Sequence, residues 1–213
     1  MRIIGIDESG KGDFFGPLVI AALVADSSRE EELRSLGVRD SKTMTPGRIA
    51  SIAEILQKKF VHSVVVVGPE KYNQLYKKIK NLNRLLGWGH ARAIENVLME
   101  AEADLAISDK FADPRVIENA LLEKSKALPL QQLVRGESVI QVAAASVIAR
   151  ATFVKQLERL SGKYGVELPK GAAAQVDAAG RELVRKYGPD VLAQVAKIHF
   201  KNYRRATDGL LSL

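Results

Sequence analysis

The chain has 213 residues, of which 46% are hydrophobic and 27% charged, so it is long enough for one sizeable core and is neither disordered nor fibrous in composition. It has no cysteine, which excludes disulfides and thiolate metal sites, and its three histidines are too few to favour a histidine-built site. The net charge of +7 favours a polyanionic partner such as nucleic acid, although a basic balance can also serve solubility alone. Without a signal-peptide pattern or a long apolar stretch, we expect a cytoplasmic monomer with no membrane partner.

The apolar patterns predict strands and helices that alternate along most of the chain. In chain order they predict strands at 2–6 and 17–25, a helix at 46–59, a strand at 62–67, a helix at 82–101 interrupted by Gly87 and Gly89, a strand at 105–107, a helix at 113–126, a strand at 130–134, and helices at 141–160, 172–187 and 190–197. The first two strands are too apolar to lie at a sheet edge. This order predicts an α/β fold in which helices flank a mixed five-stranded sheet. We expect one domain, 1–213, with a helical C-terminal part from about residue 165.

Two adjacent acids, Asp7 and Glu8, follow the first apolar run and precede a glycine-lysine-glycine turn. Neighbouring side chains of a strand point to opposite faces, so one of the two acids should be buried, and an unpartnered buried carboxylate is costly. Asp109 follows the predicted strand 105–107, and Glu137 precedes the alanine-rich helix. Four carboxylates without histidine or cysteine favour a hard cation. We therefore predict a two-metal site for Mg²⁺ or Mn²⁺, suited to phosphoryl transfer.

Each acid also has a structural explanation. Glu137 could be a helix N-terminal acid that is favoured by the helix dipole. Asp109 could be an ordinary turn residue. The structural explanation is weakest for Asp7 and Glu8, because adjacent acids at a strand end stabilise nothing obvious.

The segment 5–12 also matches the first seven positions of a phosphate-binding P-loop. However, Gly12 stands where serine or threonine should ligate magnesium, and two carboxylates inside the loop would repel phosphates. We therefore interpret Lys11 as a cation on a flexible turn, where bare backbone N–H groups can approach a phosphodiester or a ribose hydroxyl.

The opening motif resembles the type 2 ribonucleases H, and within them ribonuclease HIII more than ribonuclease HII. Ribonuclease HII typically has Asp-Glu-Ala-Gly-Arg-Gly, whereas this chain has Asp-Glu-Ser-Gly-Lys-Gly at 7–12. Further segments that look like the HIII form lie at 40–42, 72–83, 87–90, 143–150 and 197–202, so the resemblance spans nearly the whole chain. It implies an RNase H-like fold and an endonuclease that uses divalent metal to cut the RNA strand of RNA/DNA hybrids, leaving 5′-phosphate and 3′-hydroxyl ends.

The resemblance also implies roles for individual residues. Asp7, Glu8 and Asp109 become catalytic metal ligands, and Glu137 takes a fourth acidic position that is aspartate in many relatives. The turn after the first strand is implied to contact the ribose 2′-hydroxyl and the nucleic-acid backbone, and the 2′-hydroxyl is the group that distinguishes RNA from DNA. The residues implied to bind substrate are Gly10, Lys11 and Gly12 in that turn, and Ser41, Lys42, Asn83 and Ser146 at the phosphates of the hybrid.

Three alternatives stay open. They are a ribonuclease HII-like enzyme acting at single embedded ribonucleotides, another RNase H-fold nuclease such as a junction resolvase, and a non-catalytic hybrid-binding protein. The four acids argue against the last, because binding alone gains nothing from them. Ribonuclease HIII usually carries an N-terminal substrate-binding domain, whereas the first strand here begins at Arg2, so we expect weaker and more salt-sensitive binding. We interpret His90 as a packed core histidine, and His199 as either a substrate contact or a structural residue.

Overall fold

The computed structural model describes residues 1–38 and 44–208. These residues group into two compact units, each built from three chain segments. The first unit contains 1–9, 19–65 and 79–152, and the second contains 10–18, 66–78 and 153–213. The expectation of a single domain stays a prediction.

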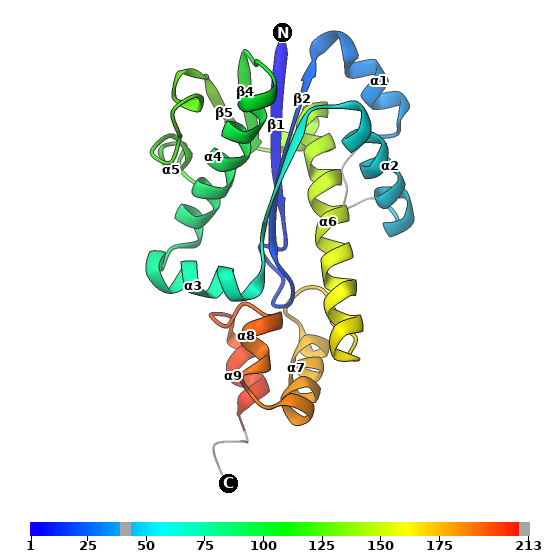
Figure 1. Ribbon diagram of the computed structural model, residues 1–213, viewed down its shortest axis with the longest axis vertical. Helices are drawn as coiled ribbons and strands as arrows, with labels where there is room; N and C mark the ends of the chain where they lie inside the picture. Colours follow the sequence, from blue (N-terminus) through cyan, green and yellow to red (C-terminus); the bar gives the residue numbers. More distant parts are fainter. Residues whose placement is uncertain (39–43, 209–213) are drawn as a thin grey trace. The chain divides into compact units, whose positions relative to one another are not determined.

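The strands form one mixed five-stranded sheet, as predicted, in the order β3-β2-β1-β4-β5 (Figure 1). Their bounds are Arg2–Ser9 for β1, Leu18–Asp26 for β2, His62–Val67 for β3, Leu105–Asp109 for β4 and Leu130–Leu133 for β5. The pair β1 and β2 is antiparallel, whereas β1 with β4 and β4 with β5 are parallel. The two most apolar strands, β1 and β2, are interior strands, which confirms the prediction from their composition.

Helices lie on both sides of the sheet, and Figure 1 shows α4 and α6 on opposite sides of β1. Glycines permit this close packing. A Cβ atom on Gly89 of α4 would lie 2.6 Å from the Ile20 side chain of β2, and a Cβ atom on Gly5 of β1 would collide with the backbone of Gln141 in α6. The helical elements that lie in the first unit, wholly or in the case of α6 in part, are η1 Ser27–Arg29, α1 Glu30–Ser35, α2 Pro46–Lys59, α4 Leu82–Glu100, α5 Arg115–Glu118, η3 Ser125–Ala127, η4 Gly136–Ser138 and α6 Ile140–Tyr164.

Two helix predictions were wrong in detail. The helix α4 runs through Gly87 and Gly89 without a break, because both glycines sit where a neighbouring element approaches and both are buried. The predicted helix 113–126 is reduced to the single turn of α5 and the short η3. A carboxylate on α4 explains the second difference: Glu95 accepts hydrogen bonds from the backbone N–H groups of Lys124 and Ser125, at 3.0 and 2.9 Å, which favours a turn there over a continuous helix.

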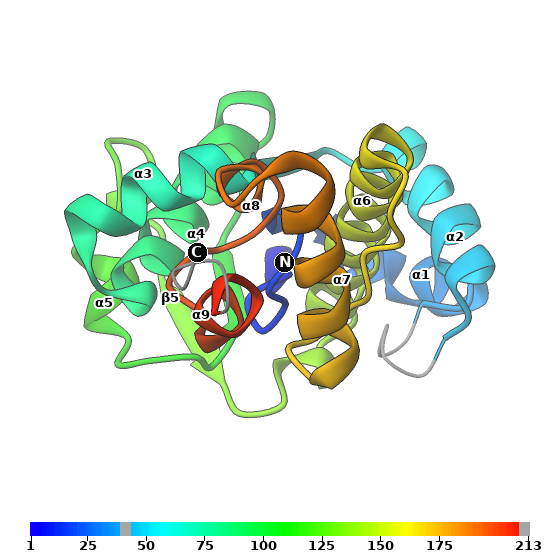
Figure 2. The ribbon, with the colours of Figure 1, turned by 90° about the horizontal axis from the view of Figure 1, so that it is seen from below.

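The second unit is mainly helical. It contains α7 Ala174–Tyr187, α8 Val191–Val195 and α9 Lys201–Thr207, together with nearly all of α3 Pro69–Ile79. Figure 2 shows α7 beside α8 and α9, and Asn202 of α9 donates a hydrogen bond of 2.6 Å to Asp177 of α7. The helical C-terminal part was predicted, whereas α1, α3 and α9 were not. No helix within the described residues is both long and apolar enough to span a membrane.

Candidate metal and nucleic-acid site

The sheet register brings two predicted metal ligands next to each other. In the parallel ladder Gly5 pairs with Ile107 and Ile6 pairs with Ser108, so one residue further along both strands Asp7 stands beside Asp109. Adjacent strands lie about 4.8 Å apart, and residues in register point to the same face. The chain order could not reveal this pair, because the two acids are far apart in sequence. The first strand was predicted to end at residue 6, whereas β1 continues to Ser9, so Asp7 and Glu8 lie inside the strand and only Asp109 stands at a strand end.

Asp7 faces helix α6, where Ser146 bonds to its carboxylate. Its Oδ1 also accepts a hydrogen bond of 2.8 Å from the backbone N–H of Glu8. Burial raises the pKa of Asp7 to about 7, and the neighbouring charge of Glu8 adds to the increase, although the bonds from Ser146 and from the Glu8 backbone oppose it. An ionised carboxylate is therefore costly at this position unless a cation accompanies it. Ser146, which the resemblance implied as a phosphate contact, is 8% exposed and lies against Asp7.

Glu8 faces the opposite side of the sheet, as the alternation along β1 requires. Its Oε2 lies 3.2 Å from Nε2 of His90 in α4, and the His90 side chain is completely buried. The His90 ring also packs on Phe111, with the ring centroids 4.8 Å apart. The interpretation of His90 as a packed, hydrogen-bonded core residue agrees with this geometry. Its contact with Glu8 was missed, because nothing in the sequence connects residues 82 positions apart.

Asp109 is tied to the segment that carries Glu137. The backbone N–H of Gly136 donates a hydrogen bond of 2.8 Å to Oδ1 of Asp109. A Cβ atom on Gly136 would lie 2.8 Å from the Asp109 Cα atom, so only glycine permits this approach. Glu137 comes next in the chain, in the first turn of η4, and it is partly buried. The structure thus links the third and fourth predicted acids through one backbone contact.

The donor set suits a hard divalent cation, since carboxylate oxygens are what Mg²⁺ and Mn²⁺ prefer. The raised pKa of Asp7 points the same way, because a bound cation would offset the cost of ionising it. Among residues 1–38 and 44–208, however, no three acidic or histidine side chains already form a group that could hold a metal ion. The opposite facing of Asp7 and Glu8 separates one of the four predicted acids, Glu8, from the rest. The four-carboxylate site therefore stays a prediction. Within it, Asp7 and Asp109 are the two acids that the sheet register places side by side.

The glycine-lysine-glycine turn begins directly after β1. Gly10 has a φ of +88°, and a Cβ atom there would collide with the carbonyl oxygen of Pro17. Gly12 is exposed, and a Cβ atom on it would meet nothing within 4 Å. The turn leads into the antiparallel strand β2 and not into a helix, which excludes a P-loop. Its base is therefore packed and its tip is open.

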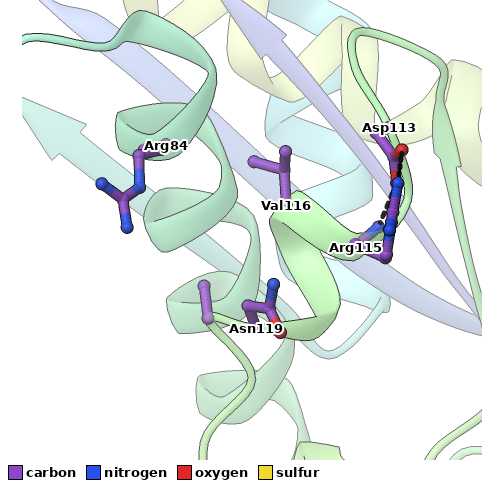
Figure 3. Close-up of a pocket in the computed structure, with 6 residues that line it drawn as sticks. Arg84, Asp113, Arg115, Val116 and Asn119 are labelled. Carbon is purple, nitrogen blue, oxygen red and sulfur yellow. Dashed lines mark hydrogen bonds and ion pairs between the residues drawn. The ribbon is translucent and has the colours of Figure 1, made fainter.

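The other predicted phosphate contacts are less well placed. Asn83 is exposed in the first turn of α4, and Ser41 and Lys42 lie outside the described residues. A cavity of about 360 Å³ opens between α4 and α5 (Figure 3), and its lining residues are Arg84, Asp113, Arg115, Val116, Asn119 and Ala120. In it Arg115 donates to Asp113 from Nε and Nη2, at 3.0 and 2.8 Å, while Arg84 points away from that pair. None of these lining residues is a predicted site residue.

Four cations lie close together near the C-terminal end of the sequence, and the structure exposes three of them, Lys201, Arg204 and Arg205. Lys197 is completely buried, so it cannot contact a substrate from the surface. Arg205 lies 3.4 Å from Asp177, and Arg204 lies 3.7 Å from Asp208. His199 is exposed and stacks on Tyr76, with the ring centroids 4.1 Å apart, so both of its possible roles stay open. Burial, with the Lys197 charge, lowers the pKa of His199.

Comparisons with known proteins define the class. A family model described as Ribonuclease HII matches residues 4–203, so the chain belongs to the ribonuclease HII family, a family of ribonucleases. The fold agrees: the chain is similar to the ribonuclease H2 from Pyrococcus horikoshii OT3, with a TM-score of 0.85 and 25% identity over all of both chains.

Within that family, the chain is similar to proteins named ribonuclease HIII. It is 43% identical to that of Protochlamydia amoebophila, covering 93% of this chain and 66% of the relative. It is 45% identical to that of Chlamydia pneumoniae, covering 97% and 70%. The crystal structure of Bst-RNase HIII in complex with Mn²⁺ has a TM-score of 0.90 and 33% identity, over 97% of this chain and 69% of that one. The chain thus spans about two thirds of the length of these relatives.

Proposed function

We propose that this protein is a metal-dependent endonuclease that hydrolyses the RNA strand of RNA/DNA hybrids, leaving 5′-phosphate and 3′-hydroxyl ends. One observation carries the proposal: in a chain of the ribonuclease HII family, the parallel register of two central strands runs to Ile6 and Ser108, so the next residues, Asp7 and Asp109, lie beside each other. The pKa of Asp7 supports it, because a carboxylate kept at this cost in a buried position suits a cation site.

Asp7, Glu8, Asp109 and Glu137 would hold two Mg²⁺ or Mn²⁺ ions. Such ions supply an activated water at neutral pH and stabilise the oxygen that leaves the phosphorus atom. The protein's contribution is the placement of its carboxylates. The N–H of Gly136 fixes one oxygen of Asp109, and the N–H of Glu8 fixes one oxygen of Asp7, so in each case the other oxygen is oriented with it. In the metal-free structure His90 bonds to the carboxylate of Glu8 on the opposite side of the sheet, so Glu8 would have to turn toward Asp7 to join the other three acids.

Substrate recognition is assigned to the turn at residues 10–12. Gly12 is exposed, so the backbone of the turn would contact a ribose 2′-hydroxyl there, and Lys11 would add a cation for the phosphates. Asn83 and the segment with Ser41 and Lys42 would bind phosphates further along the hybrid. The names of the relatives favour activity on continuous hybrids over activity at single embedded ribonucleotides.

The test is a duplex panel. The protein is incubated with end-labelled RNA/DNA, DNA/DNA and RNA/RNA duplexes of one sequence, each with Mg²⁺, Mn²⁺ or EDTA. We expect cleavage of the RNA strand in the hybrid alone, with either metal and not with EDTA. Cleavage of the DNA/DNA duplex would favour another RNase H-fold nuclease, and tight hybrid binding without cleavage under any metal would indicate a binding protein.

A further inference from the structure

The buried residue Lys197 has a polar environment that the proposed site does not use. Its side chain is completely buried, and its Nζ donates hydrogen bonds of 2.8 Å to the carbonyl oxygens of Asp13 and Gly16. A lysine is almost never fully buried without a specific partner. Here the partners are two backbone carbonyls of the segment that follows the glycine-lysine-glycine turn, which suggests that the lysine is kept for the shape of that segment.

The backbone around Lys197 is joined to the same segment. The N–H of Lys197 donates to the Phe14 carbonyl at 2.8 Å, and the N–H of Gly16 donates to the Val195 carbonyl at 2.8 Å. Phe15 and Ala196 form an isolated antiparallel bridge. Residues 13–16 therefore lie antiparallel beside residues 195–197 through this bridge, and Nζ of Lys197 bonds to the first and the last residue of the segment.

A second support fixes the other side of this segment. The Phe14 N–H donates to the Gly171 carbonyl at 2.9 Å, and the Gly171 N–H donates to Oδ1 of Asp13 at 2.7 Å. The turn itself closes on this base, since the Asp13 N–H points to the Gly10 carbonyl at 3.4 Å and Gly10 packs on the Pro17 carbonyl. The conformation of residues 10–12 thus depends on residues 13–17, while Gly12 itself is exposed and a Cβ atom on it would meet nothing within 4 Å.

We propose that Lys197 is a positioning residue that holds the turn at residues 10–12 in the conformation that distinguishes an RNA strand from a DNA strand. The inference rests on the proposed function, because it assigns the turn to recognition of the 2′-hydroxyl. Recognition of one hydroxyl needs donors and acceptors that are already in place, since ordering a loose turn on binding costs free energy. Two carbonyls fixed by one buried amine supply that order without occupying the tip.

The charge of Lys197 does not determine this role. Burial lowers the pKa of Lys197 to about 7, and the nearby charge of Asp13 opposes that change. Two other titratable groups lie near Lys197. They are Tyr72, whose ring centroid is 5.6 Å from Nζ, and His199, whose pKa the charge of Lys197 lowers. A neutral amine still carries two N–H bonds, which is the number that the two carbonyls require. Discrimination between the two strands should therefore persist on both sides of neutral pH.

The experiment measures binding without cleavage, in EDTA, so that it does not depend on catalysis. The dissociation constants of the wild-type protein, Lys197→Met and Leu183→Ala are compared for an RNA/DNA hybrid and a DNA/DNA duplex of the same sequence. Leu183 is a fully buried apolar residue of the same unit, so its truncation lowers stability without removing a donor to residues 13–16. We expect Lys197→Met to reduce the preference for the hybrid over the DNA duplex about tenfold, which is the size of effect that one lost hydrogen bond has. We expect Leu183→Ala to keep the preference of the wild-type protein.

Chemical restoration separates positioning from general stability. The chain has no cysteine, so Lys197→Cys provides a single thiol that 2-bromoethylamine alkylates in urea before refolding. The thiolate sulfur displaces bromide, and the product carries an amine at the position of Nζ. We expect this amine to restore the preference, and iodoacetamide, which adds an amide, to leave it low. If Lys197→Met does not fold, Lys197→Gln takes its place in the binding comparison.

Two results would overturn the role of Lys197. One is a preference for the hybrid that Lys197→Met leaves unchanged, and the other is an equal loss in Lys197→Met and Leu183→Ala at matched stability. Failure of the proposed function has a different signature, because the wild-type protein would then bind both duplexes equally.

Discussion

Replacing Asp7 with asparagine should stabilise the metal-free protein, and by an amount that grows with pH. Burial, with the charge of Glu8, raises the pKa of Asp7 from 3.8 to about 7. Between these values the folded protein binds a proton that the unfolded chain has released, so stability falls as the pH rises and levels off above pH 7. The full cost of ionising Asp7 in the fold is about 4 kcal/mol, at 1.36 kcal/mol for each pKa unit. The neutral amide of the Asp7→Asn variant would not bear this cost, and its oxygen can still accept the Glu8 N–H.

The assay is urea unfolding in EDTA, followed by circular dichroism, at about pH 5 and pH 8.5. The free energy of unfolding of Asp7→Asn minus that of the wild-type protein should increase by about 3 kcal/mol between the two pH values, since about two pKa units separate pH 5 from the pKa of Asp7. Adding Mn²⁺ at the higher pH should stabilise the wild-type protein more than the variant, because a bound cation compensates the ionised carboxylate.

A matched control is Asp113→Asn. Hydrogen bonds from the side chain and the backbone of Arg115 lower the pKa of Asp113 to about 2, and the guanidinium of Arg115 stays charged at both pH values. That stabilisation is fully present above pH 4, so the control should lose the same small amount of stability at both pH values. A difference between Asp7→Asn and the wild-type protein that stays constant from pH 5 to pH 8.5 would refute the buried, charge-coupled environment described for Asp7.

Three further predictions concern activity and packing. Asp109→Asn should reduce hybrid cleavage by at least about a hundredfold. Binding in EDTA should survive, because the variant removes a negative charge opposite the phosphates. A gel-shift assay in which binding falls together with cleavage would contradict this prediction. Gly5→Ala should cost about 1–3 kcal/mol in urea unfolding, because its Cβ atom would collide with the backbone of Gln141 and Val142. Gly162→Ala, in open space on α6, should instead gain up to about 1 kcal/mol, and the reasoning fails if the two changes have the same sign. A DNA duplex with one embedded ribonucleotide should be cut more slowly than a continuous hybrid, and the opposite order would favour an HII-like enzyme.

The strands β1, β2 and β3 were predictable because each contains an apolar run, and β3 begins and ends at the predicted residues. The helix α2 was predictable for a similar reason, since Pro46 stands at its first position and apolar residues follow at helical spacing. The helix α3 was not, because its composition is polar and only Pro69 and Tyr72 are buried in it. The overestimated helix at 113–126 shows a second limit: the carboxylate of Glu95 that favours the turn comes from another element.

At the candidate site, the apolar runs that precede Asp7 and Asp109 pointed to these two acids, whereas the residues that contact the acids did not follow from the sequence. The contacts of Glu8 with His90 and of Asp109 with Gly136 depend on how distant elements pack. Lys197 is the sharpest case. In the sequence it belongs to a basic cluster, which favours a solvated position, and only the fold shows that its amine is buried between two backbone carbonyls. Sequence patterns locate the acids of a site better than they locate the residues that hold them.

The most direct test of the central claim is the rate of RNA-strand cleavage in one end-labelled RNA/DNA hybrid, measured under single-turnover conditions with Mn²⁺ for the wild-type protein, Asp7→Asn and Asp109→Asn. The account predicts cleavage by the wild-type protein that stops in EDTA, and no detectable cleavage by either variant while both still bind the hybrid. Cleavage by Asp7→Asn or Asp109→Asn at a rate near that of the wild-type protein would show that the aligned carboxylates do not form the catalytic metal site.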